Sequence, residues 1–349
     1  MSKDQHKKKL EIEILDEPEE ILKHLKLGIS IPILPEFHKY IIGDIKTYNA
    51  KSIILREEIN TERFKNQTDY AIGNVLLYDD GGETLFFGYF GVYDHDPFKI
   101  EFLLDKILDF GKKNNYKTIR GPINIPTVIF GWGFMVEGSN KDYFIGCPVN
   151  PPIYQEIFLK KKFNVKFEED RYAMLVYRYN PFKDKKFDFS EFDYVNPSKA
   201  DMDKIKNEFI KLHMDYMPES ARITPKSEKN FDNIVDFVNE YGEEWMIWTV
   251  YHKPTHKMVS CGYVIPNPFS LDLKGNLDSV SFHDWVVHPD YRRKGLAMLM
   301  YGATSLKAFK TKVRWGSYPV GAENVSNSKM AQKMGGKKDR THLILEYKI

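Results

Sequence analysis

Short apolar runs alternate with segments of helical period along this chain, and one order of elements occurs twice. In the second half the pattern predicts the order β-α-α-β-β-β-α-β-α-β, and the first half ends in the same β-α-β-α-β order. Strands separated by helices are typical of an α/β (mixed α+β) fold. At 349 residues the chain has room for two domains. The sequence therefore predicts one fold used twice.

Composition marks the domain boundaries. Residues 1–36 are charged and end in the Pro-broken stretch 31–35, which predicts an N-terminal extension with some helix. The segment Pro181–Lys186 opens with proline and is mostly charged, as linkers are. We therefore expect a first domain over 37–180, a linker at 181–186 and a second domain over 187–349.

Local patterns predict the elements of each domain. Asp-Gly at 80–81 between two alternating apolar runs predicts a hairpin of strands 70–78 and 84–93. Gly111 is expected to cap a helix over 98–111, and Ser198 to begin another. Further strands are expected at 116–120, 172–179, 187–195, 245–251, 258–265, 280–287, 313–319 and 341–347. Further helices are expected at 151–162, 228–241, 296–310 and 326–334.

Composition excludes several classes of protein. Lys+Arg 51 against Asp+Glu 49 gives a net charge of +2, so bulk charge does not indicate a nucleic-acid partner. No apolar run approaches the roughly 20 residues of a membrane span, and no signal peptide is apparent, so a membrane partner is not expected. Two cysteines without a C-x-x-C motif indicate no disulfide scaffold and no metal, and favour a reducing cytoplasm.

One segment, 281–297, carries chemistry. A predicted strand ends at Val287, and a basic loop of Arg292, Arg293, Lys294 and Gly295 opens a helix at 296. The first turn of a helix offers unpaired N–H donors, and guanidinium groups bind two phosphate oxygens. Only 10 arginines occur in the chain, and only Arg292 and Arg293 are adjacent. The segment therefore predicts an anion site that suits a pyrophosphate.

Other nucleotide motifs are absent from the sequence. It contains no G-x-x-x-x-G-K-[ST] phosphate loop. The glycines at 131 and 133 are followed by the next glycine at 138, which is the wrong offset for a dinucleotide fingerprint.

The run from Val287 to Ala297 resembles the acyl-CoA signature R/Q-x-x-G-x-G/A of the GNAT acyltransferase superfamily, met here by Arg292, Gly295 and Ala297. Segments 320–324 and 334–336 resemble the closing strand and helix of that family, with Asn324 at the usual asparagine. The resemblance covers about 190–349. It implies a twisted mixed central sheet flanked by helices in this half, and the repeated element order predicts two such GNAT-like domains.

The resemblance also implies a ligand and its contacts. Acetyl-CoA or another acyl-CoA is the co-substrate, and a small-molecule or peptide amine is the acceptor. The backbone after Trp285 would pair with pantetheine, and the loop would hold the pyrophosphate. The implied binding residues are Trp285, Val286, Val287, Arg292, Arg293, Lys294, Gly295, Leu296, Ala297 and Asn324.

Acyl transfer to an amine benefits from a base. Asp284 and His283 are the candidates on the strand beside the thioester, and alternation places only one of them toward a cleft. We favour Asp284 slightly, because many GNAT enzymes carry an acid there; that neither residue acts remains an alternative. A metal site of His283, Asp284 and His288 is disfavoured, because a spacing of five points the two imidazoles to opposite faces.

The chain departs from the family at the general acid. The resemblance places a tyrosine four residues before the helix-ending glycine, where this sequence has Ala331. Tyr301, Tyr318 and Tyr347 are possible substitutes, and the sequence does not choose among them. Cys147 and Cys261 are expected to be small buried residues and not nucleophiles.

The first half resembles the N-terminal half of tandem GNAT-like proteins at 120–124, 135–138 and 150–154. Where the second half has its basic loop, the first has the acidic segment Asp94–Phe98, which would repel a pyrophosphate. We therefore expect a degenerate copy that supports or shapes the substrate cleft.

The sequence favours an acyl-CoA-dependent N-acyltransferase. Two alternatives stay open: a catalytically idle acyl-CoA-binding protein of the same fold, and a transferase that uses aminoacyl-tRNA. The acceptor, the acyl length and the oligomeric state are not determined by the sequence.

Overall fold

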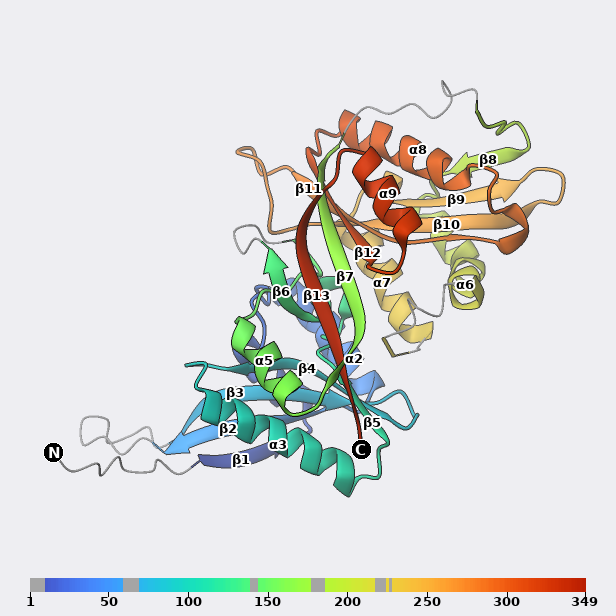
Figure 1. The fold of residues 1–349 in the computed structure, drawn as a ribbon. Coiled ribbons are helices and arrows are strands. Elements are labelled where there is room, and N and C mark those ends of the chain that lie inside the picture. The colour runs from blue at the N-terminus through green and yellow to red at the C-terminus, as the bar shows by residue number, and fades with distance from the viewer. Residues whose placement is uncertain (1–9, 59–68, 139–143, 177–185, 217–223, 226–227) are drawn as a thin grey trace. The chain divides into compact units, whose positions relative to one another are not determined.

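The chain divides into two compact units, and the strands of each unit are consecutive neighbours in a mixed sheet (Figure 1). The computed structural model describes residues 10–58, 69–138, 144–176, 186–216, 224–225 and 228–349, with the backbone alone for Glu58, Asp69, 228–231 and Asp284. The first unit comprises 1–136, 148–166 and 343–349, and the second comprises 137–147 and 167–342. The expected division at 181–186 would assign residues 343–349 to the second domain and residues 137–147 and 167–180 to the first, whereas the structure groups them the other way. Residues 181–185 of the expected linker lie outside the described residues.

The sheet of the first unit has the strand order β1-β2-β3-β4-β5-β13. Only β4 and β5 are parallel; the other neighbours are antiparallel. The strands are β1 (Leu10–Leu15), β2 (Lys51–Glu58), β3 (Asp69–Tyr78), β4 (Thr84–Val92), β5 (Thr118–Gly121) and the end of β13 (Lys337–Lys348). A further strand, β6 (Phe134–Gly138), pairs with β13.

Helices cover this first sheet. They are α1 (Pro18–His24), α2 (His38–Thr47), α3 (Pro97–Lys113), α4 (Thr127–Phe130) and α5 (Pro152–Lys160). The apolar stripe of α3 is fully buried at Ile100, Leu103, Leu104 and Ile107. Between α5 and the sheet the ring of Phe158 lies 5.2 Å from Phe87 and 4.9 Å from Phe90. Burial of these large side chains supplies the main favourable free energy of the unit.

The sheet of the second unit has the order β13-β7-β12-β11-β10-β9-β8. Only β11 and β12 are parallel among the pairs of known register. The new strands are β7 (Asn164–Leu175), β8 (Phe192–Val195), β9 (Ile247–His252), β10 (Lys257–Pro266), β11 (Ser279–Val287) and β12 (Trp315–Gly321).

Helices lie on both faces of this second sheet. The helices are α6 (Lys199–Tyr216), α7 (Glu228–Tyr241), α8 (Leu296–Lys310) and α9 (Val325–Lys333). Figure 1 shows α8 on one side of β9 and β10 and α6 on the other. Ring contacts agree: Tyr301 of α8 packs on Phe282 of β11, whereas His213 of α6 packs on Tyr263 of β10.

Most predicted elements are present with shifted ends. The hairpin, the helix at 296–310 and the Ser198 cap are confirmed; the Ser198 hydroxyl accepts from Asp201 N at 3.2 Å. Gly111 is not a cap, because α3 continues to Lys113 and Gly111 packs against Ile119. Strand β7 begins at Asn164, eight residues before the expected 172, because its charged alternate residues conceal a half-exposed strand.

Within the expected extension, residues 10–36 form a strand and a helix. Leu10–Leu15 forms a complete antiparallel ladder with β2, and Ile21 of α1 is fully buried. Charged residues dominate this segment because one side of each element is exposed, which gives the sequence little apolar signal.

The close packing over Gly262 gives a stability prediction. A Cβ there would lie 2.7 Å from Trp248 Cζ2 and 2.9 Å from Trp285 Cδ1. We expect Gly262→Ala to lower the free energy of unfolding by about 1–3 kcal/mol, because overpacking a filled core forces its rings to shift. Urea denaturation measures this. Gly82→Ala, in an exposed turn, is the control, and equal effects of the two variants would contradict the prediction.

Candidate functional site

A β-bulge interrupts β11 in the middle of the segment that the sequence singled out. His283 pairs with Tyr263 and Val286 with Cys261, so Gly262 alone lies opposite both Asp284 and Trp285. An extra residue shifts the alternation of the strand. Trp285 therefore lies on the same face as Phe282, with ring centroids 5.7 Å apart. Sequence alternation alone would place these two residues on opposite faces.

His283 lies on the other face of the sheet. Its ring stacks on Tyr263 at 6.5 Å and an interplanar angle of 4°, and 4% of the residue is exposed. Asp284, the favoured base, has its backbone in the bulge, and its side chain lies outside the described structure. Of the two candidate bases, only His283 can therefore be placed on a face.

The parallel pairing of β11 with β12 stops partway along both strands. Ser279, Val280 and Ser281 pair with Trp315, Gly316 and Ser317, and the register ends there. Farther on, β11 remains paired with β10 and β12 with β7. We call the stretches Phe282–Val287 and Tyr318–Gly321 the fork. Backbone groups that point into the fork are not used by the partner strand, so a ligand can bind them.

Aromatic rings fill the α8 side of the fork. The Trp285 ring lies 5.3 Å from Trp248, 6.3 Å from Tyr301 and 5.9 Å from Tyr318. Burial raises the pKa of the Tyr318 hydroxyl, so it stays protonated at neutral pH. Two of the three tyrosines that the sequence left open, Tyr301 and Tyr318, thus lie beside Trp285; Tyr347 belongs to the first unit.

The basic loop after β11 has the geometry of an anion site. Gly295 adopts φ 81°, a left-handed conformation that suits glycine, and precedes the first residue of α8. Its bare Cα faces the Phe187 ring, where a Cβ would lie 2.4 Å from Cγ. The N–H groups of residues 293–297 donate no hydrogen bond to any described residue. Unpaired donors at a helix start attract anions.

The cations of this loop are exposed and differ in their contacts. Arg292 Nε donates to Val287 O at 3.2 Å, which keeps that side chain at the end of β11. Lys294 Nζ lies 5.2 Å from the Tyr291 ring centroid. Arg293 has a positive φ of 65°. The arginines and free N–H groups thus converge at the junction of β11 with α8.

Two other predicted binding residues, Val286 and Asn324, lie in different elements. Val286 is buried in β11 and pairs with Cys261, and the Asn324 side chain caps α9 by accepting from Asn327 N at 3.1 Å. Ala331 is fully buried in α9. Its position therefore offers no side chain that could transfer a proton.

The first unit has a matching junction that its own chain occupies. Pairing of β4 with β5 ends at Phe86 and Arg120. The chain then continues along β4: Ile123 N donates to Phe87 O at 2.7 Å, and Tyr89 N donates to Asn124 Oδ1 at 2.7 Å. The backbone donors and acceptors that the second unit leaves unpaired at its fork are thus used internally in the first unit.

The first two residues of α3 offer no free N–H donor either. Pro97, the first residue of α3, has no N–H, and Phe98 N is bound by the Asp96 side chain at 2.8 Å. The buried cation Lys99 is held by Asp94 at 2.5 Å and by Glu57 at 3.3 Å. This junction therefore has neither open backbone nor available positive charge.

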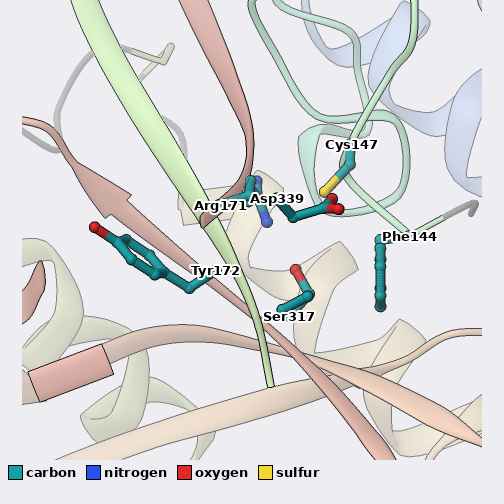
Figure 2. Close-up of a pocket in the computed structure, with 7 residues that line it drawn as sticks. Phe144, Cys147, Arg171, Tyr172, Ser317 and Asp339 are labelled. Atoms are coloured by element: carbon teal, nitrogen blue, oxygen red, sulfur yellow. The ribbon is translucent and has the colours of Figure 1, made fainter. Parts of the chain in front are cut away.

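A buried pocket on the other face of the fork escaped the sequence analysis. It is lined by Phe144, Cys147, Arg171, Tyr172, Ala173, Ser317 and Asp339, and the packed side chains leave no room for a water molecule. Figure 2 shows these residues around the pocket, with Tyr172 directed away from Phe144 and Cys147. The signal that could have found it is the rarity of arginine, since Arg171 lies inside an otherwise alternating strand.

Neither cysteine has the environment of a nucleophile. Burial raises the pKa of the Cys147 thiol and raises that of Cys261 much further. The nearby Arg171 and Arg340 oppose the effect at Cys147 without reversing it. Both side chains therefore remain neutral thiols at neutral pH.

Within the described part of the chain, no three His, Cys, Asp or Glu side chains are grouped to hold a metal ion. The same residues contain no helix long and apolar enough to cross a membrane.

Comparison with known proteins identifies the fold. No protein-family profile and no curated protein sequence matches the chain. Among solved structures, a tandem GNAT protein from the clavulanic acid biosynthesis pathway superposes with a TM-score of 0.61 at 13% identity, over 97% of this chain and 98% of that one. The N-acetyltransferase from Sphaerobacter thermophilus gives 0.52 at 7% identity, over 97% and 95%.

A third structure is larger. The glucosamine N-acetyltransferase region of a fungal multi-domain β-N-acetylglucosaminidase matches 98% of this chain with a TM-score of 0.62 at 10% identity, and the match spans 38% of that protein. The chain therefore has the fold of tandem GNAT proteins, as the resemblances of its two halves implied, and two of these three structures are named as N-acetyltransferases.

The thiol environments can be tested by alkylation. We expect neither Cys147 nor Cys261 to react with iodoacetamide at pH 8 in the native protein, and both to react after unfolding, because burial keeps them protonated and covered. Mass spectrometry counts the adducts. Ser326→Cys, which adds a thiol at an exposed position of α9, is the labelling control. Native labelling of either buried cysteine at the control's rate would contradict the structure.

Proposed function

We propose that the chain is an acyl-CoA-dependent N-acyltransferase whose active site lies in the second unit, with acetyl-CoA as the donor. One observation carries the proposal: a strand with unpaired backbone leads directly into a basic helix start with free N–H donors. The unpaired backbone of the strand suits the amides of pantetheine, and the basic helix start suits a pyrophosphate. The tandem GNAT fold supports the same assignment.

In this proposal each part of the junction has a separate task. The backbone of Trp285, Val286 and Val287 pairs with pantetheine. The guanidinium groups of Arg292 and Arg293 bind pyrophosphate oxygens, and Lys294 adds positive charge. The N–H groups of Gly295, Leu296 and Ala297 complete the anion site. Asn324 holds the start of α9 by its cap and lies at the asparagine position that the family uses for binding.

The reaction is a direct displacement. The acceptor nitrogen attacks the thioester carbonyl carbon, the C–N bond forms and the C–S bond breaks. An amine of pKa near 10.4 costs about 4.6 kcal/mol to deprotonate at pH 7, so a base accelerates the step. His283 or Asp284 takes the amine proton, directly or through water. The departing thiolate receives a proton from Tyr318 or from water.

Tyr318 is our choice for the proton donor that the family places at the position of Ala331. It follows Ser317, where the two strands separate, and its ring contacts Trp285. Its burial keeps the phenol protonated at neutral pH. Tyr301 lies beside the same indole but belongs to α8 and not to a strand of the fork.

A charge reversal tests the anion site. We expect Arg292→Glu combined with Arg293→Glu to weaken acetyl-CoA binding at least tenfold, because each lost charge-assisted contact contributes roughly 1.5–3 kcal/mol. Calorimetry measures the Kd. Lys310→Glu with Lys312→Glu, an equal charge change at the far end of α8, is the matched control. An unchanged Kd in the arginine variant would refute the site.

The purified protein also distinguishes the transferase from the two alternative functions. Thioester consumption with amines supports the transferase. Acetyl-CoA binding without turnover on any amine would favour the idle binding protein, and co-purified tRNA without acetyl-CoA binding would favour aminoacyl transfer.

The difference between the two units predicts the stoichiometry. We expect one acetyl-CoA per chain, because residues 123 and 124 already use the backbone of β4 and Lys99 is neutralised by its carboxylates. Calorimetry measures the number of acetyl-CoA molecules bound per chain. Two binding events of similar affinity in the wild type, with one retained in the arginine variant, would show that the first unit also binds.

A further inference from the structure

The fork has a closed end, which we call the apex, where Ser281 pairs with Ser317. In the proposed function pantetheine follows β11 from Val287 toward this end, so the thioester lies beside Phe282, the first β11 residue of the fork. Beyond the apex the β11–β12 ladder continues for two further residue pairs. An acyl chain that ran straight on would have to break these backbone hydrogen bonds, which is costly inside a protein.

The ring of Phe282 closes the apex on the α8 side of the sheet. Only 1% of this residue is exposed. Its ring centroid lies 5.7 Å from that of Trp285, 6.1 Å from Tyr301 and 6.3 Å from Tyr318. Aromatic rings at these separations are in packing contact. An acyl chain therefore enters this side of the apex only if a ring moves.

The glycine at position 316 of β12 makes room for the Phe282 ring. A Cβ at Gly316 would lie 2.5 Å from Phe282 Cε2 and 3.3 Å from Cδ2. Gly316 lies within a strand and is not among the residues with positive φ, so its backbone conformation does not itself call for glycine. The close approach of the ring does, and the two residues therefore form a matched pair beside the apex.

The opposite side of the apex is also filled. Ser317 lines the buried pocket on that face, where the packed side chains leave no room for a water molecule. Arg171 in the same pocket donates from Nε to Glu169 Oε1 at 2.6 Å and from Nη2 to Gly146 O at 3.2 Å. An apolar chain does not displace such a group readily, because breaking a buried ion pair leaves a charge uncompensated. Space for the acyl group is therefore limited to the fork itself.

We propose that Phe282 sets the acyl length of the donor, so that the protein binds acetyl-CoA in preference to butyryl-CoA and longer thioesters; the inference rests on the proposed function. An acetyl group ends at the Phe282 ring, and each further methylene has to displace that ring from its place over Gly316. Overfilling a packed core forces neighbouring side chains out of position. The Phe282 side is the one that a substitution can open, because it depends neither on the strand ladder nor on the buried ion pair.

A thioester series tests acyl length on the wild-type protein without turnover. Calorimetry gives the Kd values of CoA, acetyl-CoA, butyryl-CoA and hexanoyl-CoA. We expect hexanoyl-CoA to bind about tenfold or more weakly than acetyl-CoA, because one methylene too many in a close-fitting site already costs about tenfold or more. Equal Kd values for acetyl-CoA and hexanoyl-CoA would overturn the proposal.

The same series distinguishes this proposal from the proposed function. If CoA and acetyl-CoA bind and hexanoyl-CoA binds equally well, the acyl-length assignment alone is wrong. If no member of the series binds, the proposed function is wrong, and the acyl-length assignment is wrong with it.

A substitution at Phe282 locates the barrier. We expect Phe282→Leu to bring the Kd of hexanoyl-CoA to within about threefold of that of acetyl-CoA, because the smaller side chain leaves space over Gly316. Phe237→Leu, which removes another buried ring, in α7, is the matched control and keeps the wild-type ratio. A wild-type ratio in Phe282→Leu overturns the residue assignment. Should that variant fail to fold, the wild-type series and Phe282→Met, whose flexible side chain keeps the core filled, decide.

Discussion

The candidate site depends on the point where hydrogen bonding between β11 and β12 stops. Up to Ser281 and Ser317 the two strands satisfy each other, and beyond them each strand keeps a partner on one side only. Unpaired backbone is expensive inside a protein unless a ligand or water binds it. The bulge at Gly262 then places Trp285 on the aromatic face and leaves His283 on the polar face. The bulge thus separates the face that carries Trp285 and Tyr318 from the face that carries His283.

The two units differ in what binds the backbone where the parallel strand pair ends. In the first, residues after Gly121 bind along β4, Pro97 removes an N–H at the helix start, and Lys99 is surrounded by carboxylates. In the second, the ladder stays open and the helix start keeps its donors. A duplicated fold can therefore keep its architecture in both copies while only one copy retains the features of a ligand site, because packing and site chemistry depend on different residues.

Several features were predictable from local pattern. Helix α8 has the expected ends because Gly295 and its apolar stripe act locally, and the anion loop follows from the strand before it and the helix after it. Strands β1, β2 and the first half of β7 were missed or shortened, since charged alternate residues hide a strand with one exposed face. The bulge was not predictable, because it depends on how Gly262 fits between two indoles from other strands.

The arginines show most clearly what the sequence determined and what only the tertiary structure decided. The sequence by itself determined that arginine is rare, that Arg292 and Arg293 are adjacent, and that they precede a helix; those facts are local, so they indicate an anion site without a fold. Only the tertiary structure decided that Arg171 and Asp339, far apart in the chain, line one pocket with Ser317 at the end of the β11–β12 ladder. Strand order brings them together, and strand order is set by the packing of the whole sheet, which local sequence does not encode.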